Sequence, residues 1–176
     1  MILASGSPRR SELLTSIGVK FRVIAPNIEE ILNSSLSIPD QVMDLAVQKA
    51  DAVNIDNELI LAADTIVVIN DVILGKPTDS ADAVRMLKIL SGKTHSVLTG
   101  VCLKNGSSYD VFYDENIIEF KKLTEKEIVE YVETGEPLDK AGSYGIQGLG
   151  GNFVDSFTGD FNNIVGLPLI KLKEHL

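Results

Sequence analysis

The sequence predicts a mixed α/β fold, and three observations support this prediction. Helical and strand-like patterns alternate along the 176 residues, an order typical of sheets covered by helices. Residues 59–70, LILAADTIVVIN, form a nearly continuous apolar run, as expected of a strand covered on both faces. The pair 105–106, Asn-Gly, lies between two strand-like segments and indicates a hairpin, so the sheet cannot be purely parallel.

The first predicted elements are a strand and a capped helix. Residues 2–4 form a short apolar run that predicts a buried strand. Ser7 can cap a helix in which Pro8 occupies the first position, where its missing N–H costs nothing. Apolar residues then recur on one helical face, and Gly18 ends the helix.

Two more elements precede the central strand at 59–70. Residues 20–24 alternate like a strand, and residues 39–53 have the spacing of a helix. One side of that helix carries Val42, Leu45, Ala46 and Lys49. For Lys49 itself, the plain interpretation is a lysine on a solvated face.

After the central strand, the sequence predicts two hairpins. Residues 70–71, Asn-Asp, predict a turn into a strand at 72–74, and a helix is expected over 80–90. Residues 94–120 have the pattern of two or three long antiparallel strands, with 105–106 as a type I′ turn.

The last third contains a helix, a glycine-rich loop and a short final helix. Thr124 and Glu127 have the spacing of a capping box, which predicts a helix start. A loop is expected over 140–151, a strand over 151–155, and a C-terminal helix from Pro168.

Composition limits the partners of the chain. With 16 basic and 25 acidic residues, the net charge is −9, which argues against binding long nucleic acids but allows a small phosphorylated ligand. No apolar run approaches the roughly 18 residues that a membrane helix needs. The single cysteine, Cys102, excludes an internal disulfide and fits a reducing cytoplasm. His95 and His175 lie far apart, so a bound metal would need carboxylates, which favours Mg²⁺ or Mn²⁺.

The fragment SGSPRR at residues 5–10 is the first candidate site. A turn from strand to helix exposes unpaired N–H groups, and the helix dipole favours an anion there. Arg9 and Arg10 on the first turn oppose that dipole unless an anion lies between them. The alternative is a capped helix with solvated arginines.

Two further charged residues are candidates. Asp64 lies inside the central apolar strand, where a carboxylate is costly unless it is paired, hydrogen-bonded or bound to a metal. The alternative is a structural aspartate satisfied by backbone N–H groups. Lys76 in LGKP precedes Pro77, which restricts its backbone to an extended form. Its alternative is a turn lysine in solvent.

The glycine-rich segment is the fourth candidate. Five of the 14 glycines fall between residues 142 and 151, so the backbone there needs freedom or close approach. Gln147 offers both an amide donor and an acceptor, which suits contact with a base edge. A flexible linker is the alternative. His95 is expected to be structural, and Cys102 to be a buried apolar residue.

Together these pieces describe a nucleoside triphosphate site with a divalent metal. The motifs LASGSPRRSELL, AADTIVV, LGKP, LSGKTHSVLTGV, GEPLDKAGSYGIQGLGG and IVGLP occur in this order. From residue 2 to about 170, the chain resembles the Maf family of nucleoside triphosphate pyrophosphatases. The subgroup that it resembles acts on dTTP and UTP, rather than on 7-methyl-GTP.

The resemblance implies a single domain over residues 1–176, with a long twisted mixed sheet, flanking helices and two lobes around a central cleft, as in inosine triphosphate pyrophosphatases. It also implies a cytoplasmic homodimer. The implied reaction is hydrolysis between the α and β phosphates, which yields a nucleoside monophosphate and pyrophosphate.

The resemblance also assigns roles. Asp64 matches the proton acceptor, Lys49 and Lys76 match catalytic phosphate-side lysines, and Ser7 and Arg10 match the phosphate-binding loop. Glu30, with Asp64, matches the metal-linked carboxylates. Substrate choice is associated with Arg9, Thr65 and Gln147. The family often has Asp-Ile-Asp-Glu where this chain has Asn27-Ile28-Glu29-Glu30.

Two other functions are considered. Members of this family are associated with inhibition of septum formation, so the chain could be a nucleotide-binding regulator of cell division with incidental hydrolysis. A phosphatase releasing inorganic phosphate is the other alternative. The sequence has no Asp-x-Asp or Cys-x₅-Arg pattern, which argues against a covalent phosphatase.

Overall fold

The computed structural model, which describes residues 1–53, 55 and 57–176, has a mixed α/β fold. Its strands are β1 (Ile2–Ala4), β2 (Arg22–Val23), β3 (Ile60–Ile69), β4 (Val72–Leu74), β5 (Thr94–Asn105), β6 (Ser108–Phe120) and β7 (Val154–Phe157). They form a sheet in the order β2-β1-β3-β5-β6-β7, and β4 pairs with β3. β1 is parallel to β2 and β3, whereas the pairs β3–β4 and β6–β7 are antiparallel. The predicted fold class is therefore confirmed.

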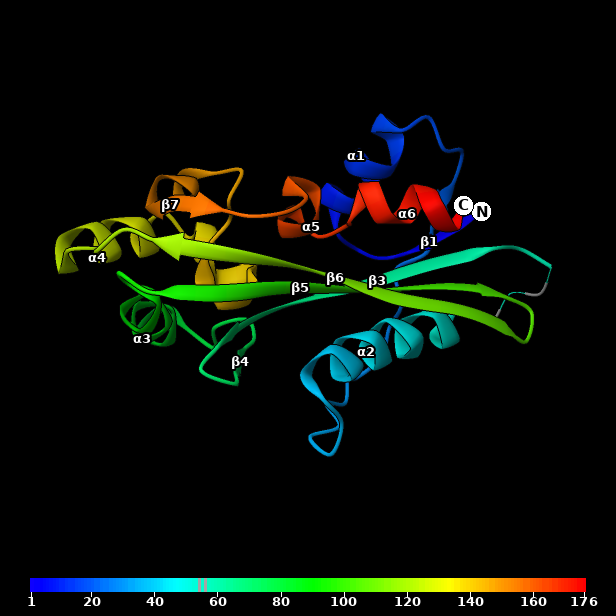
Figure 1. Cartoon of the computed structure of the whole chain (residues 1–176), viewed down its shortest axis with the longest axis horizontal. Helices are drawn as coiled ribbons and strands as arrows, with labels where there is room; N and C mark the ends of the chain where they lie inside the picture. Colours follow the sequence, from blue (N-terminus) through cyan, green and yellow to red (C-terminus); the bar gives the residue numbers. More distant parts are fainter. Residues whose placement is uncertain (54, 56) are drawn as a thin grey trace. The chain divides into compact units, whose positions relative to one another are not determined.

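Six α-helices accompany this sheet in the described residues (Figure 1). They are α1 (Pro8–Ser16), α2 (Ile38–Ala52), α3 (Ser80–Leu90), α4 (Glu125–Glu133), α5 (Phe161–Val165) and α6 (Leu169–His175). Three short 3₁₀ helices follow α4: η1 (Glu136–Asp139), η2 (Ala141–Ser143) and η3 (Leu149–Phe153). In the part of the chain that the structure describes, no helix is long and apolar enough to cross a membrane.

The chain divides into two compact units. Unit 1 consists of Met1–Thr65, Leu98–Asp114 and Asn162–Leu176, and unit 2 of Ile66–Val97 and Glu115–Phe161. Both units are discontinuous in sequence because the strands β3, β5 and β6 each contribute residues to both of them.

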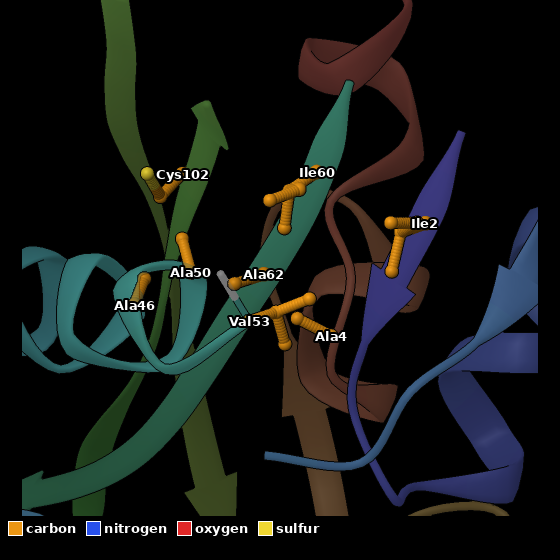
Figure 2. Close-up of a cluster of buried hydrophobic side chains, with 8 residues drawn as sticks. All are labelled: Ile2, Ala4, Ala46, Ala50, Val53, Ile60, Ala62 and Cys102. Carbon is orange, nitrogen blue, oxygen red and sulfur yellow. The ribbon is translucent and has the colours of Figure 1, made fainter. Parts of the chain in front are cut away.

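Unit 1 is held together by apolar packing between α2 and the sheet. Small side chains of α2, Ala46 and Ala50, meet strand residues in one buried cluster (Figure 2). The cluster comprises Ile2, Ala4, Ala46, Ala50, Val53, Ile60, Ala62 and Cys102. The helix backbone comes very close to β5, since a Cβ atom on Gly100 would lie 2.4 Å from the Val42 carbonyl oxygen. Glycine is thus required where α2 crosses β5.

Unit 2 has a core with several aromatic rings. Its helices α3 and α4 pack against each other. Phe120 lies edge-to-face with His95, Tyr144 and Phe153. The His95 and Phe120 centroids are 4.8 Å apart, a favourable separation for perpendicular rings.

Elements with strong local signals match their predictions. The helix predicted over 80–90 is α3, and Thr124 with Glu127 forms the predicted capping box at the start of α4. Asn70 and Asp71 have φ of 50° and 61°, the pattern of a type I′ turn between β3 and β4.

One predicted turn is wrong, and two predicted strands have different bounds in the structure. The loop between β5 and β6 is Gly106-Ser107, and only Gly106 has a positive φ (57°), so a type I′ turn at 105–106 is excluded. The strand predicted over 20–24 shrinks to the two residues of β2. The strand predicted over 151–155 starts too early, because Leu149–Phe153 form η3 and β7 is Val154–Phe157.

Candidate active site

The centre of the candidate site in unit 1 is a buried ion pair between a strand and a helix. Asp64 lies within β3, and the residue as a whole is only 8% exposed. Lys49 lies on the buried side of α2, one turn beyond Leu45, and its Nζ forms an ion pair with the Asp64 carboxylate. The solvated face predicted for Lys49 is therefore wrong, because its helical spacing places it with the apolar residues of α2.

A second carboxylate contacts the same ammonium group. Glu30 comes from the segment between β2 and α2, and its Oε1 lies 3.1 Å from Lys49 Nζ. Its side chain is 45% exposed, in contrast to that of Asp64. Lys49 thus joins a buried carboxylate to one that solvent and ligands can reach.

Arg10 is buried on the first turns of α1 and fixed by three hydrogen bonds. Its Nε donates to the Gly166 carbonyl oxygen at 2.8 Å. Its terminal nitrogens donate to Thr65 Oγ1 at 3.0 Å and to Ser5 Oγ at 3.4 Å. These bonds use three of the five guanidinium donors, so the described residues leave two for a ligand.

A chain of hydroxyl groups supports Arg10 from behind. Thr65 Oγ1 lies 2.9 Å from Thr99 Oγ1, and Thr99 donates to the Asn163 carbonyl oxygen at 3.0 Å. Because a hydroxyl has one proton, Thr65 must donate to Thr99 and can then accept from Arg10. The guanidinium position is therefore set by β3, β5 and the segment that contains α5.

Positive and negative side chains interact with one another in this cluster. Burial lowers the pKa of Arg10, while attraction to Asp64 raises it, repulsion from Arg9 lowers it, and attraction to Glu30 raises it. These five groups, Arg9, Arg10, Lys49, Asp64 and Glu30, are thus electrostatically coupled. Positive side chains of α1 and α2 thus lie beside the two carboxylates, in a chain whose net charge is −9.

The N-terminal turn differs in detail from its prediction. Ser7 is the N-cap residue of α1 and Pro8 follows it, but the Ser7 hydroxyl accepts no capping hydrogen bond. Instead, the Ser7 N–H donates to Ser5 Oγ at 3.1 Å. The half-buried Ser7 hydroxyl is therefore not needed to hold the helix start.

The donor set fits a divalent metal only with help from a ligand. The described residues contain no group of three or more His, Cys, Asp or Glu side chains that could hold a metal ion. Glu30 and Asp64 do converge on one cation, the Lys49 ammonium. Mg²⁺ is commonly bound by one or two carboxylates, with phosphates and water as its other ligands.

Two predicted site residues belong to unit 2. Lys76 is exposed in the turn after β4, next to the buried Pro77. Gln147 is exposed on the glycine-rich loop between η2 and η3. In unit 1, by contrast, the structure brings together Arg9, Arg10, Glu30, Lys49, Asp64 and Thr65.

Sequence patterns missed several residues that organise these sites. In unit 1 these are Ser5 and Thr99, which bond to Arg10 and Thr65. In unit 2 they are Tyr131 and Glu136, which bond to the glycine-rich loop. Their partners lie at variable distances along the chain, so no local spacing identifies them.

His95 and Cys102 are both buried. His95 Nε2 lies 2.8 Å from the Tyr144 hydroxyl, its Nδ1 has no partner among the described residues, and burial lowers its pKa to about 4. Cys102 is fully buried, and burial raises its pKa to about 11, which keeps it a thiol. Nucleophilic catalysis needs a thiolate, so Cys102 is unsuited to it.

Comparisons with known proteins show which family this chain is similar to. The family model of Maf-like proteins matches residues 1–176. A protein of Bacillus cytotoxicus named dTTP/UTP pyrophosphatase is 51% identical over 177 residues, covering 99% of this chain and 93% of the relative. A protein of Bacillus anthracis with the same name is 50% identical over 178 residues, covering 100% of this chain and 93% of the relative. Among solved structures, the Staphylococcus aureus Ham1 protein aligns with 68% of this chain and 70% of its own, with 15% identity and a TM-score of 0.44.

The family model and these relatives cover nearly the entire chain. Their agreement extends through both compact units and through every segment that supplies a candidate site residue. We conclude that this chain belongs to the family of Maf-like proteins.

Proposed function

We propose that this chain is a nucleoside triphosphate pyrophosphatase that hydrolyses dTTP and UTP to the monophosphate and pyrophosphate. The observation that carries the proposal is the buried Asp64 carboxylate, held by Lys49 beside the buried Arg10. A buried carboxylate among cationic groups suits proton transfer next to a polyanion. The names of the Bacillus relatives support the choice of dTTP and UTP.

In the proposed reaction, water attacks the α-phosphorus and the bond from that phosphorus to the bridging oxygen breaks. Asp64 accepts a proton from the attacking water, and the bridging oxygen leaves with pyrophosphate. Lys49 holds the Asp64 carboxylate in place. Arg10, whose remaining N–H donors are preset by Thr65 and Gly166, stabilises negative charge on the phosphates.

We propose roles for five other residues as well. Ser7 binds phosphate through its hydroxyl, and Lys76 offsets charge on the departing group. Arg9, Thr65 and Gln147 contribute to substrate choice, with Gln147 hydrogen-bonding the pyrimidine edge. A site built on such hydrogen bonds rejects bases that leave its polar groups unpaired.

Glu30 and Asp64 would hold a divalent cation, Mg²⁺ or Mn²⁺, together with the substrate phosphates. When bound, the ion supplies positive charge against the phosphoryl oxygens and lowers the pKa of water. We propose that Glu30, whose side chain is 45% exposed, gives up its contact with Lys49 when such an ion binds.

We also propose a cytoplasmic location and a homodimeric assembly. The cytoplasmic location is supported by Cys102, the single cysteine, which is a free buried thiol with a raised pKa and has no second cysteine for a disulfide. A homodimer is implied by the family resemblance. Light scattering of the purified chain tests the dimer, and a molar mass near one copy of 19.1 kDa would refute it.

The central test is product analysis with labelled water. The purified chain is incubated with Mg²⁺ or Mn²⁺ and each of dTTP, UTP, CTP, GTP, ATP and 7-methyl-GTP in H₂¹⁸O. We expect monophosphate and pyrophosphate from dTTP and UTP, with ¹⁸O only in the monophosphate. Label in pyrophosphate, or release of inorganic phosphate, would contradict attack at the α-phosphorus.

The chain offers a matched pair of variants for this test. Asp64→Asn should lower turnover by at least about 100-fold. Asp51→Asn removes a carboxylate on α2 that pairs with Lys104 at 2.7 Å and is 46% exposed, so it should leave turnover unchanged. Near-normal turnover by folded Asp64→Asn would overturn the mechanism. Nucleotide binding without any cleavage by the wild type would favour the regulator of cell division.

A further inference from the structure

The loop that carries Gln147 is a folded unit with closed turns. The Gly148 N–H donates to the Gly145 carbonyl oxygen at 3.2 Å, and the Gly151 N–H donates to the Gly148 carbonyl oxygen at 3.1 Å. Gln147 lies inside the first turn with an exposed side chain. The position of the Gln147 amide group therefore depends on the contacts that hold these turns.

Two side chains from outside the loop hold it. Glu136, the first residue of η1, accepts from the Leu149 N–H at 3.1 Å and from the Gly150 N–H at 3.2 Å. Tyr131 on α4 donates its hydroxyl to Glu136 at 2.9 Å and accepts from the Gly145 N–H at 3.2 Å. The backbone is thus fixed on both sides of Gln147.

The glycines allow this close approach. A Cβ atom on Gly148 would lie 2.5 Å from Glu136 Oε1, and one on Gly150 would lie 2.6 Å from the Tyr131 hydroxyl oxygen. Real Cβ atoms do not come so close to other atoms. The glycine-rich composition of this loop is therefore explained by the side chains that it wraps around.

Glu136 is suited to this role as an anion. Its partial burial raises its pKa, but hydrogen bonds from Leu149, Tyr131 and Gly150 outweigh that effect and lower its pKa below the ordinary value. Burial raises the pKa of Tyr131, so its hydroxyl keeps the proton that it donates. Bonds to a charged acceptor are stronger than neutral ones, and the anchor is correspondingly stiff.

We infer that Glu136 is a positioning residue for substrate choice, which acts by holding the Gln147 loop in the conformation that presents its amide to the base. This inference rests on the proposed function, in which Gln147 contacts the pyrimidine. Glu136 belongs to unit 2 and the Lys49–Asp64 pair to unit 1, so its loss should alter base selection more than the chemical step.

The experiment compares Glu136→Gln with Glu133→Gln, an exposed glutamate at the end of α4 that loses the same charge. The amide of Glu136→Gln keeps one acceptor oxygen and turns an NH₂ group towards a backbone N–H, which breaks one anchor with little change in shape. Kinetics are measured with dTTP, UTP, ATP and GTP. Hydrogen exchange of the peptide covering residues 145–151 is measured in parallel without nucleotide.

For Glu136→Gln we expect a rise in KM for dTTP and UTP of about tenfold, with kcat changed by less than about threefold. The preference for pyrimidine over purine triphosphates should fall by a similar factor. Exchange of the 145–151 peptide should rise, and Glu133→Gln should match the wild type in every measurement. Tyr131→Phe is the second variant, and it should show the same pattern through loss of the Gly145 anchor.

A double variant tests the route of the effect. If Glu136 acts through Gln147, then Glu136→Gln added to Gln147→Ala should change the base preference by less than about twofold. An equal effect in both backgrounds, or unchanged exchange in Glu136→Gln, would overturn the inference. A wild type that cleaves no triphosphate would instead refute the proposed function, and exchange would then decide alone whether Glu136 holds the loop.

Discussion

Replacement of Lys49 by methionine tests how much the buried ion pair with Asp64 stabilises the fold. The side chains of Lys49 and Asp64 are 10% and 12% exposed, so removing the ammonium leaves a carboxylate that water scarcely reaches. Removing one partner of a buried pair costs about 3–5 kcal/mol. Arg10 also attracts Asp64, so we expect a loss near the lower end, about 3 kcal/mol.

This loss can be measured by urea unfolding followed by circular dichroism. For a chain of 176 residues, about 3 kcal/mol corresponds to a fall in Tm of roughly 6–12 °C. Because both residues lie in unit 1, hydrogen exchange of β1 and the first half of β3 should rise in Lys49→Met.

Two controls separate the buried contact from the exposed one. Glu30→Gln removes the carboxylate that is 45% exposed, and we expect a loss of no more than about 1 kcal/mol. Lys49→Met combined with Asp64→Leu replaces the pair by apolar groups and should recover most of the stability. The reasoning is refuted if Lys49→Met costs less than about 1 kcal/mol, or if the double variant is less stable than Lys49→Met alone.

Four further predictions concern pH, packing and metal. Burial lowers the pKa of His95 from 6.5 to about 4, so between these pH values the unfolded chain binds one proton more than the folded chain. The free energy of unfolding should therefore fall by roughly 3 kcal/mol at most as the pH is lowered from 6.5 to 4. Urea unfolding of His95→Gln should show a flatter pH dependence. Thr99→Val breaks the hydroxyl chain behind Arg10 and should cost about 1–3 kcal/mol and raise KM for dTTP; an unchanged KM would show that the chain does not position Arg10. Gly100→Ala places a Cβ atom 2.4 Å from the Val42 carbonyl oxygen and should cost roughly 1–3 kcal/mol in urea unfolding, whereas Gly75→Ala, with open space around it, should cost far less. Chelation with EDTA should abolish cleavage of dTTP, and added Mg²⁺ or Mn²⁺ should restore it; full activity in EDTA would exclude the proposed metal.

The sequence predicts best those elements that are determined by contacts between residues close together in the chain. The capping box of Thr124 and Glu127 and the turn at Asn70-Asp71 are local contacts, and the structure confirms both. The turn between β5 and β6 lies at Gly106-Ser107, one residue later than the sequence predicts, because an Asn-Gly pair fits more than one hairpin register.

The candidate site was only partly predictable. The Asp64 carboxylate was identifiable because an acidic residue in an apolar strand requires a partner, but the strand itself does not say that the partner is Lys49. The helical spacing of Lys49 with Leu45 already placed it on the buried side, so its burial could have been predicted. Glu136 could not, since its role depends on backbone N–H groups 13 and 14 residues further along the chain.

The discontinuous make-up of unit 1 has a consequence during protein synthesis. Arg10 donates to the carbonyl oxygen of Gly166, which lies 156 residues later in the chain. Arg10 therefore cannot form this hydrogen bond until the ribosome has added Gly166, long after it has added α1. All of unit 2, which ends at Phe161, is translated before the last segment of unit 1 begins at Asn162. A nascent chain can thus complete unit 2 while Arg10 still lacks its Gly166 acceptor, and nucleotide hydrolysis would begin only after Gly166 has been added.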